Sequence, residues 1–419
     1  MRILALLVLS CGLAASSAAL AEDPASAGYG TAAGCGPAPT TTLTVPVAGH
    51  PFSAIPNADG CSVYVSVAGV APATSGNVAV LQRKGDVVTV AGSVPVHSQP
   101  AIMALTHDGK LLVAADAIDV AFIDPVALAA GQANAVLGYI NEKGTGVVSV
   151  AISPDDNTLF VADESSSTIT VIDLAKVRAG DFTADTVLGK IPVGRSPVGL
   201  AVSNDGKYLY STSQIAPASA KWPIVCVREG QRKKGVQDAQ GMVMVADAQL
   251  ARTSAATAIL SLVPSGCNTV RVALSPDNTT AYATARGSNQ VFAFDTAKMV
   301  PAPDAAQTGV VTVGTSPVGI TLTGNGSGLV VTNSDRFNTG TDGTLSAIDT
   351  TKFASGAGAV LGIVETGAFP RELSMTSGGT MLVTNFMSNT VEFIPANPLP
   401  LKPTADETPS TDASAPPDP

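Results

Sequence analysis

The stretch VSVAISPDDNTLFVADESSSTITVID, residues Val148–Asp173, is one copy of a unit that recurs along the chain. A second clear copy is Val270–Asp295, which reads VRVALSPDNTTAYATARGSNQVFAFD. Each copy contains an apolar strand, a short polar turn, a second apolar strand, a loop and a third strand that ends in Asp. One copy is too short to bury both faces of its own sheet, so neighbouring copies must stack and share a core.

The unit occurs seven times, and the turns between its first two strands are successively 49, 47, 50, 72, 48 and 53 residues apart. Alternating β-branched and apolar runs fill these intervals and leave no room for helical crossovers. Pairs such as Asp59-Gly60 and Asp108-Gly109 suit antiparallel hairpins, because glycine tolerates a positive φ. The sequence therefore predicts an all-β, seven-bladed β-propeller with four antiparallel strands in each blade. The equivalent turn positions are Asn57, Thr106, Ser153, Ser203, Ser275, Thr323 and Thr376.

The two ends of the repeat region indicate how the ring closes. Thr41–Val47 resembles the outermost strands of other units but precedes the first complete unit, and the last unit ends at Thr390–Ile394 without an outermost strand. We expect the N-terminal strand to complete the seventh blade, which removes an exposed sheet edge. The expected organisation is a signal peptide over 1–21, a linker over 22–40, the propeller over 41–395 and a disordered Pro- and Asp-rich tail over 396–419.

Two segments resemble the YVTN-type β-propeller repeat family. They are VVTN at Val330–Asn333 and LVTN at Leu382–Asn385, and the second is followed by Asn389–Val391. GxxP motifs at Gly194–Pro197 and Gly314–Pro317 strengthen the resemblance, which covers most of the chain. Proteins with this repeat include extracytoplasmic binding and surface proteins, a DNA-binding periplasmic propeller, lactonase-like hydrolases and propeller domains of redox enzymes. The resemblance therefore implies the fold but no single activity.

The N-terminus has the pattern of a secretory signal. Arg2 precedes the apolar run Ile3–Leu9, and a run of small residues ends at Ala21, where cleavage is expected. The mature protein is then periplasmic or secreted. An alternative places a lipid on Cys11, although Leu9 fits poorly before the small residue that precedes the modified cysteine. Charged residues interrupt every later apolar stretch, so no membrane span is expected in the mature chain.

Four cysteines remain after cleavage, and export makes disulfides the expected state. In such a sheet the loop into each blade and the loop between its second and third strands lie on one face, here called the upper face. Cys226, in an insertion between second and third strands, and Cys267, in a loop into a blade, both belong there. Cys61 follows a turn on the lower face, and Cys35 precedes the closing strand, which begins there. We therefore expect the pairs Cys35–Cys61 and Cys226–Cys267.

The chain is acidic, with a formal net charge of −10, which disfavours nonspecific binding to nucleic acid or anionic membranes. The 72-residue interval contains an insertion, residues 211–241, that is basic by contrast. It holds the single tryptophan, Trp222, together with Arg228 and Arg232. The hypothesis is a contact surface for an anionic ligand or a partner protein, with Trp222 as an aromatic anchor. The alternative is a solvated loop fastened by Cys226.

Loops of the upper face converge on the central channel, the default location of a ligand site. We expect His50, His97, Arg195 and Arg371 there from loops into blades, and Glu164 from a loop between second and third strands. The alternative for the histidines is ordinary hydrogen bonding within loops, and for the two arginines a structural bridge between blades. The same reasoning places on this face Gln99, Asp163, Asp335, Arg336 and Glu372.

An Asp recurs at the end of the third strand in five units, a regularity that a unique catalytic group would not show. These residues are expected to cap turns through their side chains. They are Asp124, Asp173, Asp247, Asp295 and Asp349.

The signatures CxxCH, HExxH, GxSxG and GxxxxGK[ST] are absent from the sequence. We therefore assign no catalytic residue, no metal site and no cofactor. The leading hypothesis is an exported, non-catalytic binding protein that presents its funnel face and the insertion to a protein or small ligand of the cell envelope. One alternative is a lactonase-like hydrolase that activates water with His50 or Glu164. Another is nucleic-acid binding through the basic insertion.

Overall fold

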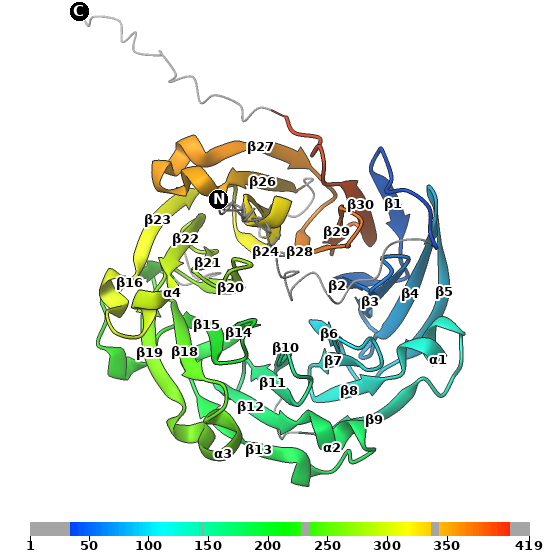
Figure 1. Ribbon diagram of the computed structural model, residues 1–419, viewed down its shortest axis with the longest axis horizontal. Coiled ribbons are helices and arrows are strands. Elements are labelled where there is room, and N and C mark those ends of the chain that lie inside the picture. The colour runs from blue at the N-terminus through cyan, green and yellow to red at the C-terminus, as the bar shows by residue number, and fades with distance from the viewer. Residues whose placement is uncertain (1–33, 142, 144–145, 228–234, 337–342, 403–419) are drawn as a thin grey trace, which may run out of the picture.

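The structure is a computed structural model that describes residues 34–141, 143, 146–227, 235–336 and 343–402. Seven four-stranded antiparallel sheets are arranged radially around a central channel (Figure 1), which confirms the predicted seven-bladed β-propeller. In each of blades 1 to 6 the chain runs from the innermost strand to the outermost one. A separate two-stranded hairpin belongs to the insertion in blade 4.

Blades are numbered in chain order. Blade 1 contains β2 (His50–Pro56), β3 (Ser62–Ala68), β4 (Asn77–Lys84) and β5 (Val87–Pro95). Blade 2 contains β6 (Met103–Leu105), β7 (Leu112–Asp116), β8 (Asp119–Ile123) and β9 (Val136–Ile140). Blade 3 contains β10 (Val147–Ile152), β11 (Thr158–Asp163), β12 (Thr168–Asp173) and β13 (Val187–Pro192). Blade 4 contains β14 (Arg195–Val202), β15 (Tyr208–Ile215), β18 (Met242–Asp247) and β19 (Ile259–Pro264). Blade 5 contains β20 (Thr269–Leu274), β21 (Thr280–Ala285), β22 (Gln290–Asp295) and β23 (Gln307–Thr312). Blade 6 contains β24 (Pro317–Thr323), β25 (Gly328–Asn333), β26 (Thr344–Asp349) and β27 (Val360–Glu365). Blade 7 contains β28 (Pro370–Met375), β29 (Thr380–Asn385), β30 (Thr390–Pro395) and β1 (Leu43–Pro46).

The middle strands of the blades are buried on both faces because each sheet packs between two neighbours. Every residue of β3 and β11 is buried, whereas most of the outermost strand β5 is exposed or only partly buried. The core is divided among the spaces between blades. Phe122 and Leu159, for example, fill the space between blades 2 and 3 and are fully buried. Each such side chain contributes about 1.5–3 kcal/mol of hydrophobic stabilisation.

Short helical turns connect third to fourth strands, and the predicted Asp caps are found at their starts. Asp124 Oδ1 accepts hydrogen bonds from the Val126 and Ala127 N–H groups at 2.8 and 3.0 Å. Asp173, Asp295 and Asp349 cap α2, α4 and η7 in the same way, and Asp247 caps the turn before α3. The helices are α1 (Pro125–Ala129), α2 (Leu174–Arg178), α3 (Ala251–Ser254) and α4 (Thr296–Met299), with 3-10 turns η1 (Ala184–Thr186), η2 (Ala218–Ala220), η4 (Ala255–Thr257), η5 (Pro303–Ala305), η6 (Gly324–Gly326) and η7 (Thr350–Ala359).

The ring closes as expected from the chain ends. β1 pairs antiparallel with β30, with Leu43 opposite Phe393 and Pro46 opposite Thr390, so the N-terminal strand is the outermost strand of blade 7. At the other end the structure describes the first residues of the expected tail, up to Lys402. The chain follows blade 6 as far as Lys402, whose N–H and C=O groups both bond to Ile363 of β27.

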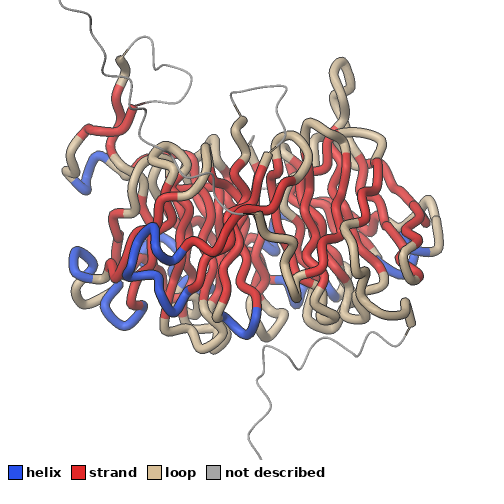
Figure 2. The backbone as a smooth tube through the Cα atoms, turned by 90° about the horizontal axis from the view of Figure 1, so that it is seen from above, coloured by secondary structure: helices blue, strands red, loops and turns tan. Residues whose placement is uncertain are grey.

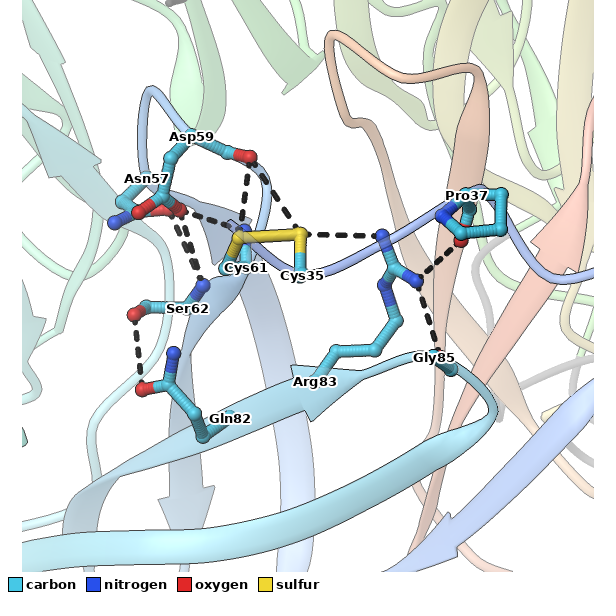
Figure 3. Close-up of a disulfide and its surroundings, with 9 residues drawn as sticks. All are labelled: Cys35, Pro37, Asn57, Asp59, Cys61, Ser62, Gln82, Arg83 and Gly85. Carbon is cyan, nitrogen blue, oxygen red and sulfur yellow. Dashed lines mark hydrogen bonds between the residues drawn. A yellow bond between two sulfur atoms is a disulfide. The ribbon is translucent and has the colours of Figure 1, made fainter. Parts of the chain in front are cut away.

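A disulfide fastens the segment before β1 to blade 1 on the lower face (Figure 3). Cys35 is bonded to Cys61, as expected, next to the turn between β2 and β3. Arg83 lies beside this bond, 5% exposed, and donates to the Pro37 and Gly85 carbonyls at 2.7 and 3.1 Å. The guanidinium thus bonds one carbonyl of the incoming segment, that of Pro37, and one of the β4–β5 turn of blade 1, that of Gly85.

Deleting residues 41–47 should lower the free energy of unfolding by at least about 3 kcal/mol, because Val45 loses its burial and β30 loses its ladder partner. Differential scanning calorimetry measures this loss. Val45→Asp should also be strongly destabilising, whereas Thr44→Asp on the exposed side of the same strand should have little effect. An unchanged melting curve after the deletion would contradict this closure of the ring.

Candidate functional site

A cavity of about 360 Å³ opens on the upper face, where blades 3 to 7 meet the channel. Its lower wall is a ring of four valines contributed by the innermost strands of blades 3 to 6. A deeper cavity of about 240 Å³ continues along the channel, and the side chain of Arg271 lines both. The four valines are Val148, Val198, Val270 and Val318.

β-bulges in the innermost strands aim these residues at the channel. The pairing register shifts across Val148, Val198 and Val270, and the shift in β24 spans Val318 and Gly319. A bulge bends the strand and re-aims one side chain. All four valines stand five residues before the turn position of their repeat, so the repeat itself builds the ring.

Blade 7 breaks this pattern, because Arg371 occupies the equivalent position. The shift in β28 spans Arg371 and Glu372. The guanidinium carbon lies 3.6 Å from the ring centre of Phe52, 5.0 Å from that of Phe386 and 5.4 Å from that of Phe369. Its Nε is buried and has no hydrogen-bond acceptor among the described residues. Arg371 is therefore a cation enclosed by aromatic rings.

The pKa of Arg371 is lowered to about 9, first because burial disfavours the cation and then because the Arg271 guanidinium repels it. Arg336 and Arg286 add to this repulsion. The side chain stays positively charged at neutral pH. The lowered pKa therefore reflects burial first and the neighbouring guanidinium groups second, and the Glu372 carboxylate opposes both.

The other charged groups of the cavity are tied to one another. Arg271 Nε donates to Glu372 Oε1 at 2.9 Å, and this pair joins blade 5 to blade 7 across the channel. On the opposite wall Arg286 donates to Gln214 Oε1 at 2.9 Å, and Gln214 donates in turn to Glu164 Oε1 at 3.0 Å. The position and orientation of each charge are thus fixed by a neighbouring side chain.

Three residues predicted for the upper face, Glu164, Arg336 and Arg371, line the cavity, whereas His50, His97 and Arg195 do not. The His50 Nδ1 atom lies 2.9 Å from the Phe386 carbonyl oxygen, and the His50 ring stacks on Phe386. Arg195 is paired with Asp238 at 2.9 Å, in the insertion of its own blade rather than in a neighbouring blade.

His97 is engaged near the outer strand of blade 2. Its Nδ1 atom lies 2.8 Å from Asp119 Oδ2, and its ring stacks on Tyr139 with 3.5 Å between ring centres. Asp119 is 4% exposed and Asp116, opposite it in the β7–β8 hairpin, is fully buried. The Oδ1 atom of each has no hydrogen-bond partner in the described part of the chain.

The pKa of Asp116 is raised to about 7, mainly by burial. A hydrogen bond from the Ser98 N–H group opposes this rise, and the charge of Asp119 adds to it. Burial raises the pKa of Asp119 as well, opposed by its bond to His97. This cluster therefore holds a proton at a pH where an exposed carboxyl has lost it.

The insertion in blade 4 forms the hairpin β16 (Ile224–Val227) and β17 (Gln237–Ala239), which projects from the upper face (Figure 2). The expected disulfide Cys226–Cys267 anchors it. Trp222 is partly buried and packs against the core between blades 3 and 4, so it is not an exposed anchor. Arg228 and Arg232 lie outside the described residues. The exposed apolar side chains of the hairpin are Ile224, Val225 and Val227, at 64, 59 and 44%.

Sequence reasoning missed Arg271, Arg286, Gln214 and Phe369, all of which line the cavity. Alignment on the turn positions contained a signal for the first. Four residues before the turn, the other blades carry small or apolar residues, whereas blade 5 has Arg271 and blade 7 has Glu372. The residues at this position in the other blades are Ser53, Ile102, Ser149, Gly199 and Gly319.

Across the described ranges, no group of three or more His, Cys, Asp or Glu residues is placed to hold a metal ion. Within the same part of the chain, no helix has the length and apolar character needed to cross a membrane.

No family model and no curated protein matches the sequence, so membership of the YVTN-type family stays a prediction. Solved structures do match the fold. Hydrazine synthase of Kuenenia stuttgartiensis is similar with a TM-score of 0.60 and 18% identity, over 84% of this chain and 96% of that one. A chain of a mitotic checkpoint complex reaches 0.57 and 14%, over 93% and 98%. The periplasmic gluconolactonase of Pseudomonas aeruginosa reaches 0.56 and 18%, over 80% and 88%. Functions this varied leave only the propeller in common.

The Asp116 cluster predicts a pH dependence of stability. The folded protein keeps this proton up to about pH 7, whereas the unfolded chain loses it near pH 4, so the contribution of Asp116 to stability falls as pH rises between these values. Asp116→Asn should therefore gain stability relative to the wild type by roughly 2 kcal/mol between about pH 4.5 and pH 8. Thermal melts across this range test it, with the exposed Asp304→Asn as control. Parallel stability curves for the wild type and Asp116→Asn would contradict the raised pKa of the buried Asp116 carboxyl.

Proposed function

We propose that this protein is an exported, non-catalytic binding protein that takes up a small ligand in the cavity on its upper face. The observation that carries the proposal is the cavity itself. Five blades contribute to it, four valines and Phe369 form the apolar part of its wall, and charged and polar side chains form the rest. This combination is typical of small-molecule sites. The two disulfides are consistent with an extracytoplasmic location, where such a ligand would be met.

The chemistry of the cavity supports binding rather than turnover. Glu164 is held by Gln214, Glu372 by Arg271, and the two histidines of the upper face are engaged with Phe386 and Asp119. A nucleophile with an adjacent base, which covalent catalysis needs, is not among the side chains that line the cavity.

A hydrolase is the second candidate, and Glu164 is the observation that favours it. Its carboxylate lines the cavity and could activate a water molecule, as the sequence-based alternative requires. One of the similar solved structures is named as a gluconolactonase, which makes lactones the substrates to test. Turnover of sugar or acyl lactones that disappears in Glu164→Gln would establish this candidate in place of the binding protein.

The hairpin β16–β17 is proposed as a contact for a protein partner beside the cavity. It leaves blade 4 directly after Gln214, which lines the cavity. Its disulfide fastens β16 to the loop that enters blade 5, and its exposed side chains Ile224 and Val225 are apolar. Exposed apolar side chains on a rigid support favour association.

The ligand proposal predicts that screening neutral and charged small molecules by thermal shift will find compounds that raise the melting temperature, because a ligand that binds only the folded state stabilises it. Val148→Trp, which fills the cavity from its partly exposed wall, should abolish the shift. Leu361→Trp adds the same ring on the outer rim and should retain it. NMR of the bound compound should show it unchanged. A compound converted to product, or a shift retained in Val148→Trp, would contradict the proposal.

The partner proposal predicts that the double substitution Ile224→Asp and Val225→Asp reduces recovery of a specific protein from envelope extracts at least about tenfold, since a charge at an apolar contact costs on the order of 1–3 kcal/mol. Val90→Asp on the exposed outer strand of blade 1 is the matched control. Identical recovery with all three proteins would remove the hairpin from the proposed interface.

A further inference from the structure

We infer that the cavity is a site for a small organic anion, whose carboxylate or phosphate group binds Arg371 and whose body rests on the valine ring. The inference rests on the proposed function and assigns its ligand class. The first observation is the placement of Arg371. Six blades have an apolar residue at the channel position, and blade 7 alone has a charged one. The six apolar residues are Phe52, Ala101, Val148, Val198, Val270 and Val318.

The guanidinium of Arg371 lacks the partner that a buried cation ordinarily has. Its Nε is buried with no acceptor among the described residues, and the nearest acid in sequence, Glu372, is bonded to Arg271. Aromatic faces stabilise a cation but accept none of its N–H groups as a carboxylate does. Arg371 is partly buried and lines the cavity, so an anion that enters the cavity can reach its exposed N–H groups and compensate the charge.

The charge balance of the cavity also favours an anion. Four guanidinium groups line it against the single carboxylate of Glu164, with Glu372 bound to Arg271 directly beneath. A cleft lined mainly by side chains of one charge sign raises the local concentration of an oppositely charged ligand. The four arginines are Arg271, Arg286, Arg336 and Arg371.

Backbone strain at Phe369 is an independent second observation. Phe369 has a φ of 54°, in the left-handed region that bulky residues rarely adopt. Three other blades use the same conformation at the equivalent position, with small or polar residues: Ser196, Asn268 and Ser316, at φ values of 54, 53 and 54°. Such strain is kept where function requires it. Here it brings an aromatic ring to the cavity wall and to the side of Arg371.

These features define the ligand. A carboxylate or phosphate can bind the guanidinium through two parallel N–H···O bonds, which a neutral amide cannot reproduce. The apolar ring of valines and Phe369 suits a hydrocarbon or sugar body, and 360 Å³ lies at the small end of ligand cavities. Binding would place a negative charge beside the Arg371 guanidinium within the cavity.

Isothermal titration calorimetry of the full mature protein tests this with hexanoate, gluconate and inorganic phosphate, and with hexanamide as the neutral match of hexanoate. The three anions distinguish an apolar carboxylate, a hydroxylated carboxylate and a phosphate. We expect at least one anion to bind, and hexanamide to bind at least tenfold more weakly than hexanoate if hexanoate is that anion. Arg371→Met should weaken anion binding at least tenfold. Arg195→Met removes an arginine of the same face that is paired with Asp238 outside the cavity, and should change affinity less than twofold.

Folding of the variant is checked without ligand. Arg371→Met replaces an unpaired cation among phenylalanine rings by an apolar chain of similar length, so its melting temperature should equal or exceed that of the wild type. Arg371→Lys keeps the charge without the two-pronged geometry and should bind anions with intermediate affinity.

Three results would overturn the inference: no binding of any of the three anions at about 10 mM, hexanamide affinity equal to that of hexanoate, or full anion affinity in folded Arg371→Met. The proposed function is tested separately. Neutral compounds that bind the wild type but not Val148→Trp would leave the binding protein standing while excluding the anion site. Anion binding that is lost in Arg371→Met supports both.

Discussion

The requirement that each sheet be covered on both faces governs this structure. A four-stranded blade whose middle strands are apolar on both faces is not stable alone in water. Each neighbouring blade covers one of these faces and must itself be covered on its other face. A ring is the arrangement in which every sheet is covered and none is terminal. The pairing of β1 with β30 follows from the same requirement, because a ring with an incomplete last sheet leaves β30 as an open edge.

The repeat builds a symmetric frame, and the candidate site consists of departures from that symmetry. Bulges at equivalent positions produce an apolar collar around the channel, which has no specificity of its own. Arg371 replaces one apolar residue of this collar. Arg271 and Glu372, which are bonded to each other, occupy the next position along their strands, where the other blades carry small or apolar residues. The charges are distributed unevenly around the channel, and this asymmetry can orient a polar molecule in the cavity.

Local rules in the sequence were sufficient for the fold, because turn residues, strand periodicity and Asp caps act over a few positions. They also placed Cys226 and Cys267 on one face correctly, since strand order determines the face. The site was recovered only in part. Glu164 and Arg371 line the cavity as expected, but whether His97 faces the channel or Asp119 depends on packing between loops of different strands, which no local pattern encodes. Trp222 turned inward for the same reason.

The bond between Cys35 and Cys61 changes the mechanics of the seam between the last blade and the first. Without it, β1 would be held to blade 1 from one side only and could peel away from β30 beginning at its free end. With it, both flanks of β1 are covalently tied to blade 1, and the strand is the middle of a closed loop. Separating β1 from β30 then requires the hydrogen bonds between the two strands to break together rather than one after another from an end. Because proteases act on frayed chain ends, that resistance is kinetic protection of the folded ring.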